Sequence, residues 1–272
     1  KGDIFSTKAT KALAKILLKD SAHIQEEEAA YANKKNFSKH KPALPLYTSD
    51  DANRSLSMFK TKTLNEEFSV GDFTIEFYEA GHILGAVSVV VKTDGKSILF
   101  SGDLGRPHDL LIGPPSAPPT VDYIVMESTY GDRLHGKEDP IEEMSKLVQE
   151  IKDKKSVLMI PSFAVGRVQD LLYCLYQVFK NKPALKMPLY VNSPMATKVT
   201  ELYSLFVDEH ILDKETCDEV CSVARFVETI NESRKLNQSK GPMIIIAGSG
   251  MITGGRILHH LSAFGDDPNN TI

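Results

Sequence analysis

Long apolar runs are absent from this sequence of 272 residues. A membrane-spanning helix needs about eighteen or more consecutive apolar residues, so neither a membrane span nor a membrane partner is predicted. The opening segment also lacks the apolar core of a signal peptide. The three cysteines, Cys174, Cys217 and Cys221, form no CxxC pair and cannot all pair with one another. These absences favour a cytoplasmic protein with free thiols.

An excess of positive charge is absent as well. The net charge is −4, which argues against a generally basic nucleic-acid binder. If RNA is the partner, its contacts must be concentrated in a groove. The lysines of the first forty-one residues alternate with Glu26–Glu28, which favours a solvated helical face over a dedicated RNA patch.

The first part of the chain reads as one helix followed by strands. Residues 6–32 have apolar residues at helical spacing, and the strands have the period of two that marks half-buried sheets. Asp94-Gly95 is typical of a hairpin turn. The predicted strands are 73–78, 87–91, 97–100 and an apolar strand, expected to be buried, at 121–126.

The pattern changes beyond Gly131, where amphipathic helices alternate with short apolar strands. This alternation predicts βα units and a mainly parallel sheet flanked by helices, so the fold class is α/β. We therefore expect two domains, residues 1–131 and 132–272. The predicted strands of the second domain are 157–160, 189–191 and 243–247.

Three acidic or histidine side chains follow strand ends in the first part. His82 lies in Ala-Gly-His-Ile-Leu-Gly, Asp103 in Ser-Gly-Asp-Leu-Gly-Arg, and Glu127 in Glu-Ser-Thr-Tyr-Gly. An imidazole and a carboxylate at neighbouring strand ends can meet around a metal. Each piece alone also fits a plain structural role, as a turn residue or a cap.

Two segments of the second part run from a strand through a glycine turn to an arginine and a helix. They end at Arg167 and Arg256, and serines 162, 193 and 249 stand at the corresponding strand ends. Such groups at the carboxyl edge of a parallel sheet can bind phosphate. We expect an RNA-backbone clamp there.

Other candidate ligands are predicted to be structural. The adjacent His259 and His260 point about 100° apart on a helix, so they cannot chelate one ion and should lie on its surface. His135 receives the same interpretation. Cys217 and Cys221 have helical spacing.

The three strand-end motifs, in this order and with twenty-one residues from His82 to Asp103, resemble the metallo-β-lactamase superfamily in its β-CASP nuclease branch. The resemblance continues through Ser-Phe-Ala-Val-Gly-Arg (162–167), Asn-Ser-Pro-Met-Ala (192–196) and Gly-Ser-Gly-Met with Gly-Gly-Arg (248–256). It implies a partial metallo-β-lactamase αββα sandwich plus a β-CASP domain. It also implies zinc-dependent hydrolysis of RNA, as in RNA processing or decay.

The resemblance assigns roles to individual residues. His82 corresponds to a terminal zinc ligand, Asp103 to the carboxylate that bridges two zinc ions, and Glu127 to a residue that orients a ligand histidine. A homodimer is an expectation on family grounds only. The residues expected to bind substrate are Ser162, Gly166, Arg167, Ser193, Ser249, Gly250, Met251, Gly254, Gly255 and Arg256.

The main zinc motif of the family, HxHxDH, is missing, because no HxH occurs among the eight histidines. The two late histidine motifs of the family are missing too. We therefore interpret the chain as a fragment, and we expect it to bind zinc weakly and to cleave little RNA by itself.

Three other functions stay open. Gly248-Ser249-Gly250 with Gly254 resembles the phosphate loop of a dinucleotide-binding oxidoreductase, although no strand pattern leads into Asp266 and Asp267. A non-catalytic RNA-binding subunit of the same family is a second alternative. A DNA nuclease of the same fold is the third.

Overall fold

The structure is a computed structural model that describes residues 2–134, 136 and 138–272, so His135 lies outside the described residues. The chain forms two compact units. Unit 1 contains Lys1–Arg106 and Pro114–Glu127, and unit 2 contains Pro107–Gly113 and Ser128–Ile272. The predicted division into domains 1–131 and 132–272 differs from these units by the excursion at 107–113 and by four residues at the boundary.

Unit 1 opens with two helices and a small parallel pair of strands. Helix α1 (Lys8–Lys35) begins after Thr7, whose side chain accepts a hydrogen bond from the Thr10 N–H, and ends at the left-handed Asn36. The predicted helix at 6–32 is confirmed. Helix α2 (Ser49–Leu56) follows, and β1 (Ile4–Ser6) pairs with β2 (Phe59–Thr61).

A five-stranded sheet forms the rest of unit 1, in the order β3-β4-β5-β6-β7. The turn between β5 and β6 has positive φ at Asp94 (48°) and Gly95 (70°), which confirms the predicted hairpin. All pairs are antiparallel except β6 with β7. The strands are β3 (Phe68–Val70), β4 (Phe73–Glu79), β5 (Val87–Thr93), β6 (Lys96–Phe100) and β7 (Tyr123–Val125).

The prediction that the strand at 121–126 is buried is wrong. Tyr123, Ile124 and Val125 are 56%, 63% and 52% exposed. The cause is the place of β7 in the sheet, since it is the last strand and pairs within the described residues only with β6. An apolar composition makes a strand suitable for burial. Whether the strand is buried depends on the strands and helices that pack against it.

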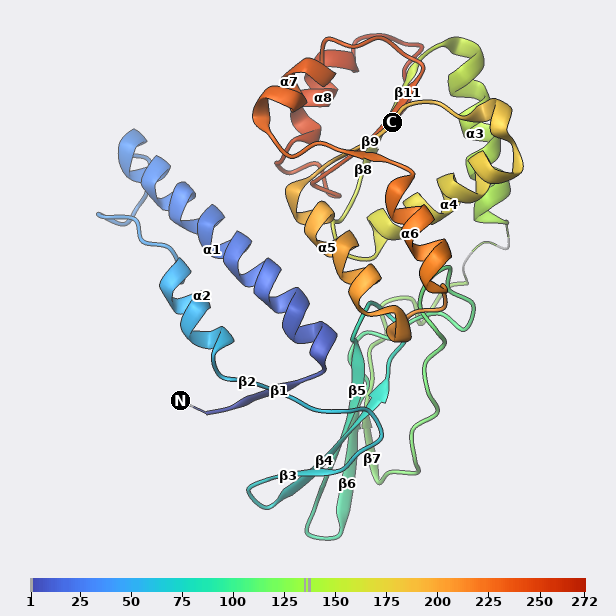
Figure 1. Ribbon diagram of the computed structural model, residues 1–272. Coiled ribbons are helices and arrows are strands. Elements are labelled where there is room, and N and C mark those ends of the chain that lie inside the picture. The colour runs from blue at the N-terminus through green and yellow to red at the C-terminus, as the bar shows by residue number, and fades with distance from the viewer. Residues whose placement is uncertain (1, 135, 137) are drawn as a thin grey trace. The chain divides into compact units, whose positions relative to one another are not determined.

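Unit 2 is an α/β layer structure, as predicted. Its four strands are all parallel and lie in the order β10-β9-β11-β8. Figure 1 shows α7 and α8 on one side of this sheet and α3 and α4 on the other. The elements are α3 (Pro140–Lys154), β8 (Val157–Pro161), α4 (Arg167–Asn181), β9 (Leu189–Asn192), α5 (Pro194–Leu205), α6 (Lys214–Ser222), β10 (Arg225–Phe226), α7 (Ile230–Leu236), β11 (Met243–Ala247) and α8 (Ile257–Phe264), with 3-10 turns at Pro183–Leu185 and Val207–Glu209.

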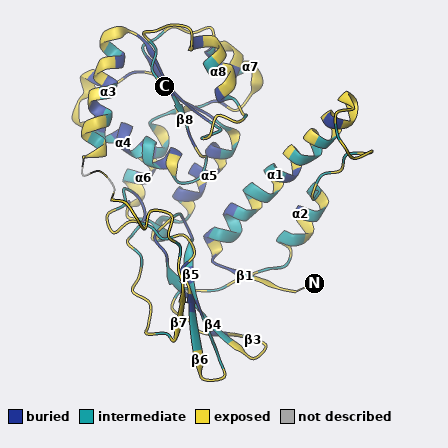
Figure 2. Ribbon diagram, turned by 180° about the vertical axis from the view of Figure 1, so that it is seen from behind, coloured by how far each residue is buried: buried dark blue, intermediate teal, exposed yellow. Residues whose placement is uncertain are grey.

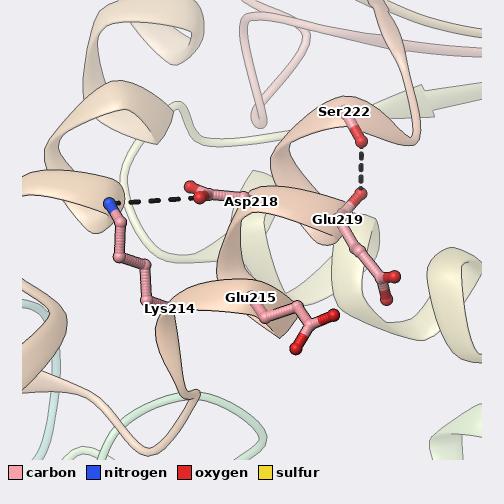
Figure 3. A pocket seen from close by; sticks show the side chains of 5 residues that line it. All are labelled: Lys214, Glu215, Asp218, Glu219 and Ser222. Carbon is pink, nitrogen blue, oxygen red and sulfur yellow. Dashed lines mark hydrogen bonds and ion pairs between the residues drawn. The ribbon is translucent and has the colours of Figure 1, made fainter.

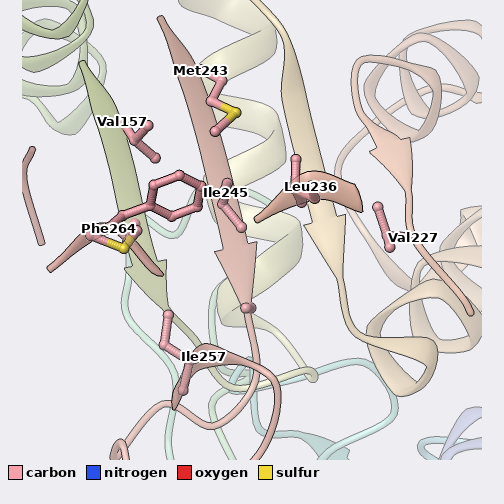
Figure 4. Packing of buried hydrophobic residues seen from close by; sticks show 9 residues of the cluster. Val157, Val227, Leu236, Met243, Ile245, Ile257 and Phe264 are labelled. Carbon is pink, nitrogen blue, oxygen red and sulfur yellow. The ribbon is translucent and has the colours of Figure 1, made fainter. Parts of the chain in front are cut away.

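The core of unit 2 lies on both faces of β11, whose five residues are all buried. On the face covered by α7 and α8, Ile245 packs in a cluster with Leu236 of α7 and Ile257 of α8 (Figure 4). In Figure 2 the buried residues of this unit gather on the strands and on the helix faces turned toward them. This core fixes the carboxyl ends of β8, β9 and β11 relative to one another.

Candidate functional site

The turns that carry His82 and Asp103 pack backbone against backbone in unit 1. The Gly105 N–H donates to the Ala80 carbonyl at 2.8 Å. A Cβ on Gly105 would lie 1.6 Å from the Gly81 carbonyl oxygen, so only glycine allows this approach. The two motifs, separate in sequence, therefore meet at one end of the sheet.

His82 and Asp103 lie together at this end, as predicted. Nε2 of His82 is 4.0 Å from Oδ2 of Asp103, and the two side chains are 44% and 78% exposed. Both side chains are therefore accessible from solvent, and an imidazole with a carboxylate is a donor set that suits zinc. We call this pair with Glu127 the metal edge.

Glu127 holds the turn that carries Asp103. Its Oε1 accepts a hydrogen bond from the Leu104 N–H at 2.8 Å, and its own N–H donates to the Ser101 hydroxyl at 3.0 Å. Ser101 donates in turn to the Gly102 carbonyl at 2.7 Å. These bonds tie Glu127 to the Asp103 turn, and its predicted role of orienting a ligand histidine stays a prediction.

The metal edge by itself does not complete a metal site. Among the described residues, no group of three or more His, Cys, Asp and Glu side chains is placed to hold a metal ion. A catalytic zinc takes about three protein ligands. His82 and Asp103 therefore fit part of a coordination sphere, and a zinc ion held there would need further ligands.

The carboxyl edge of the parallel sheet in unit 2 gathers the three predicted serines. Ser162, Ser193 and Ser249 follow β8, β9 and β11, which are neighbours in the sheet. The loops touch, because the Ser162 N–H donates to the Ala247 carbonyl at 3.0 Å. A Cβ on Gly250 would lie 2.8 Å from the Phe163 ring, which explains the glycine. We call the three serines and the loops that carry them the carboxyl edge.

Arg167 opens helix α4 at this edge. Its side chain is 59% exposed and lies 3.7 Å from the carboxylate of Asp170. The helix begins after Gly166, which has φ 76°. The Arg167 N–H donates to the Val165 carbonyl at 2.9 Å, and Val168 and Gln169 are buried, so the exposed Arg167 side chain is what this helix start offers to a ligand. Met251, at 70%, is also exposed, and a Cβ on Gly254 would meet nothing within 4 Å.

Arg256 has the predicted place between the glycine turn and α8, but its guanidinium faces the protein. Nη1 donates to Asn192 Oδ1 at 2.6 Å and to the Val227 carbonyl at 2.8 Å, and Nη2 donates to the Glu228 carbonyl at 2.5 Å. These bonds use three of the five N–H donors of the side chain. The geometry does not support the expected fork onto phosphate.

His260 is the clearest correction. The prediction placed His259 and His260 on a helix surface, and this is right for His259 only, because His260 is 0% exposed. It lies on the buried stripe of α8 with Ile257 and Phe264. Burial, with the nearby His259 and Arg256, lowers the pKa of His260 to about 4.

Asn192 is the functional candidate that sequence reasoning missed. It is fully buried and contacts both His260 and Arg256. The signal was present, because an asparagine directly after an apolar strand must find partners for its amide once it is buried.

Helix α6 carries a shallow surface hollow that contains none of the predicted site residues (Figure 3). Its lining includes Lys214, which pairs with Asp218 at 4.0 Å, and Ser222, which donates to the Glu219 carbonyl at 2.9 Å. With three carboxylates on one exposed helix face, this is a solvated surface. Cys217 and Cys221 lie on the same helix, at the spacing that the sequence indicated.

The chain is similar in sequence to known proteins. Residues 168–272 match the family model of the Beta-Casp domain. Ribonuclease TTHA0252 of Thermus thermophilus is 32% identical over 100% of this chain and 60% of its own length. Cleavage and polyadenylation specificity factor 73 of Drosophila melanogaster is 30% identical over 100% of this chain and 38% of its own, and Probable RNase MJ4 of Methanocaldococcus jannaschii is 29% identical over 99% and 60%.

Unit 2 is thus an α/β unit whose residues 168–272 match the Beta-Casp domain. The chain belongs to the β-CASP branch of the metallo-β-lactamase superfamily, which confirms the resemblance seen in the motifs. It spans 60% or less of the length of these three relatives. Among the described residues no helix is both long and apolar enough to cross a membrane.

Proposed function

We propose that the whole protein hydrolyses phosphodiester bonds in RNA with zinc, as a ribonuclease of RNA processing or decay. The observation that carries the proposal is the meeting of His82 and Asp103 at 4.0 Å. Gly105 lets their two turns pack together, and Glu127 holds the turn that carries Asp103. Zinc bound there would activate water and stabilise charge on the phosphate. The names of the relatives, ribonucleases and a cleavage factor, support the substrate.

The chain's own residues supply two kinds of function in this proposal. The metal edge offers one imidazole and one carboxylate, and the carboxyl edge offers Arg167 and the hydroxyls of Ser162, Ser193 and Ser249 for the RNA backbone. Gly166, Gly250, Met251, Gly254 and Gly255 shape the loops that would contact the strand.

The dinucleotide alternative loses support from the fold. A dinucleotide-binding loop needs an acidic residue at the end of the next strand. Asp266 and Asp267 come just after α8, which ends at Phe264, and the isolated bridge of Thr271 with Leu158 comes after them.

The other two alternatives keep the fold. A non-catalytic RNA-binding subunit would use the carboxyl edge but not the metal edge, and a DNA nuclease would use both. We favour catalysis because the metal edge retains an intact His82 and Asp103, and RNA because the relatives named above are ribonucleases. A cytoplasmic location, favoured by three free cysteines, and a homodimer complete the proposal.

The test is cleavage by the whole protein of a labelled single-stranded RNA and of DNA of the same sequence, with zinc and with a chelator. We expect zinc-dependent cleavage of the RNA. Cleavage of DNA alone supports the DNA nuclease, and binding of RNA without cleavage supports the non-catalytic subunit.

Zinc per molecule of the 272-residue chain is the companion measurement. Because the described residues present two donors, we expect clearly less than one zinc per chain by elemental mass spectrometry. Two tightly bound zinc ions together with RNA cleavage by this chain would show that other residues complete the site.

A further inference from the structure

A hydrogen-bonded polar cluster lies behind the carboxyl edge. It consists of Asn192 at the end of β9, Arg256 before α8 and His260 within α8, and we call it the Asn192 lock. Asn192 and His260 are 0% exposed. Polar groups in such a place are costly unless each finds a partner, and the bonds of the lock meet that requirement.

The bonds allow one arrangement of donors and acceptors. Oδ1 of Asn192 accepts from Arg256, so its Nδ2 must be the donor, to Ser233 Oγ at 2.8 Å and to His260 Nε2 at 2.7 Å. Nε2 of His260 is therefore the acceptor, and its Nδ1 carries the proton and donates to Asn237 Oδ1 at 2.5 Å. His260 is neutral in this arrangement, in agreement with its lowered pKa.

The lock is joined covalently to both loops that carry the serines. Ser193 follows Asn192 directly and caps α5 by accepting from the Ala196 N–H at 3.2 Å. Arg256 ends the turn that begins at Gly248, and this turn closes where the Ile257 N–H donates to the Gly248 carbonyl at 2.9 Å.

The two loops also lie against each other. A Cβ on Gly248 would be 3.7 Å from the Ser193 hydroxyl. A shift of Asn192 or Arg256 would therefore move Ser193 and Ser249 together, and with them the surface offered to a nucleic-acid backbone.

We propose that Asn192, Arg256 and His260 are positioning residues for RNA binding, with Arg256 acting through Asn192 on the serine loops and making no contact with phosphate. The cation that would contact phosphate directly is Arg167, because its side chain is exposed. The guanidinium of Arg256, by contrast, is turned inward. This inference rests on the proposed function, because it takes RNA as the ligand. The arrangement of protons in the Asn192 lock does not depend on the proposed function.

The proton arrangement is tested by N192D, with N237D as the matched control. An aspartate at 192 has no N–H to donate, so His260 must gain a proton at Nε2 to keep the bond, and its pKa should rise well above 6. At 237 an aspartate still accepts from Nδ1, and the Asn192 N–H that faces Nε2 opposes a second proton on the ring, so the neutral form should persist. We expect the imidazole nitrogen NMR signals of the whole protein at pH 6 to show neutral His260 in wild type and N237D, and imidazolium in N192D. A protonated His260 in wild type overturns the arrangement.

The role of Arg256 is tested by the salt dependence of RNA binding to the whole protein, using R167Q, R256Q and R256K. Losing one phosphate contact lowers the slope of log K against log salt by about 0.7 for a single strand. We expect R167Q to lower the slope by about this amount. R256Q should weaken binding at least tenfold with the slope unchanged, and R256K, which keeps the charge, should weaken it similarly.

The possible outcomes distinguish a failure of the inference from a failure of the proposed function. If R256Q lowers the slope as R167Q does, or if R256K binds like wild type, Arg256 contacts phosphate and the inference is wrong. A merely structural loss reduces the amount of active protein without changing the dissociation constant, and this too contradicts positioning. If wild type binds no RNA, the proposed function fails, and the NMR result still decides the lock.

Discussion

His260 shows how one side chain couples the stability of unit 2 to pH. In the unfolded chain a histidine has a pKa of about 6.5, whereas in the fold that of His260 falls to about 4. Between these values the unfolded state binds the extra proton, so this contribution to stability is present above pH 6.5 and is lost as pH falls toward 4.

We therefore expect His260 to contribute about 3 kcal/mol to the loss of unfolding free energy between pH 7 and pH 4. Urea unfolding of wild type and H260Q at several pH values measures it. The slope of stability against pH should be shallower in H260Q, whereas H259Q, at an exposed neighbour, should keep most of the wild-type slope. Parallel curves for wild type and H260Q would refute the prediction.

At Gly105 the fold permits only glycine. In G105A the new methyl group would meet the Gly81 carbonyl at 1.6 Å, and backbone on both sides must move. We expect a loss of at least about 3 kcal/mol of unfolding free energy. The matched control is G113A, because a Cβ on Gly113 meets nothing within 4 Å. Equal stabilities of the two variants would show that the turns do not pack as described.

At the scale of elements, the start of α1 supports the His82 turn. The Thr7 hydroxyl accepts from the Thr10 N–H at 3.1 Å and donates to the Gly85 carbonyl at 2.9 Å, at the end of the motif that contains His82. A Cβ on Gly85 would lie 2.6 Å from the Thr10 nitrogen, so this helix end and this turn fit closely.

Removing that hydroxyl should destabilise unit 1. We expect T7A to cost about 1–2 kcal/mol by denaturant unfolding, because both a helix cap and a buried turn contact are lost. T7S keeps the oxygen and should recover most of the loss. If T7S is as unstable as T7A, the methyl group and not the hydroxyl is what matters.

Sequence reasoning predicted the elements with a strong period. The helices around Val148 and Leu172 and the strands around Ile245 show their pattern over many residues, and parallel pairing follows from their alternation. Short elements such as β1 with β2 gave no signal, because three-residue strands are defined by a partner about fifty residues away.

The sequence predicted which residues lie at the site better than it predicted which way their side chains point. His82 and Asp103 meet as the motifs indicated, whereas Arg256 and His260 point inward. Glycine-turn-arginine patterns fix the position of a side chain along the chain. Whether that side chain faces solvent depends on partners such as Asn192, which come from other strands and helices.

At the scale of the whole molecule, each unit carries one half of the proposed chemistry. Unit 1 presents His82 and Asp103, and unit 2 presents Arg167 and the serine loops. In the proposed function, the metal edge would act on a scissile phosphate of RNA and the carboxyl edge would bind backbone phosphates.

The most direct measurement is the rate of RNA cleavage by the whole protein carrying D103N, compared with wild type and with D94N, a control at the hairpin turn. We expect D103N to lose at least about a thousandfold in rate, since removing a proposed carboxylate ligand would disable metal-assisted hydrolysis. D94N should cleave at nearly the wild-type rate. Cleavage by D103N at the wild-type rate would contradict the central claim that the metal edge performs the reaction.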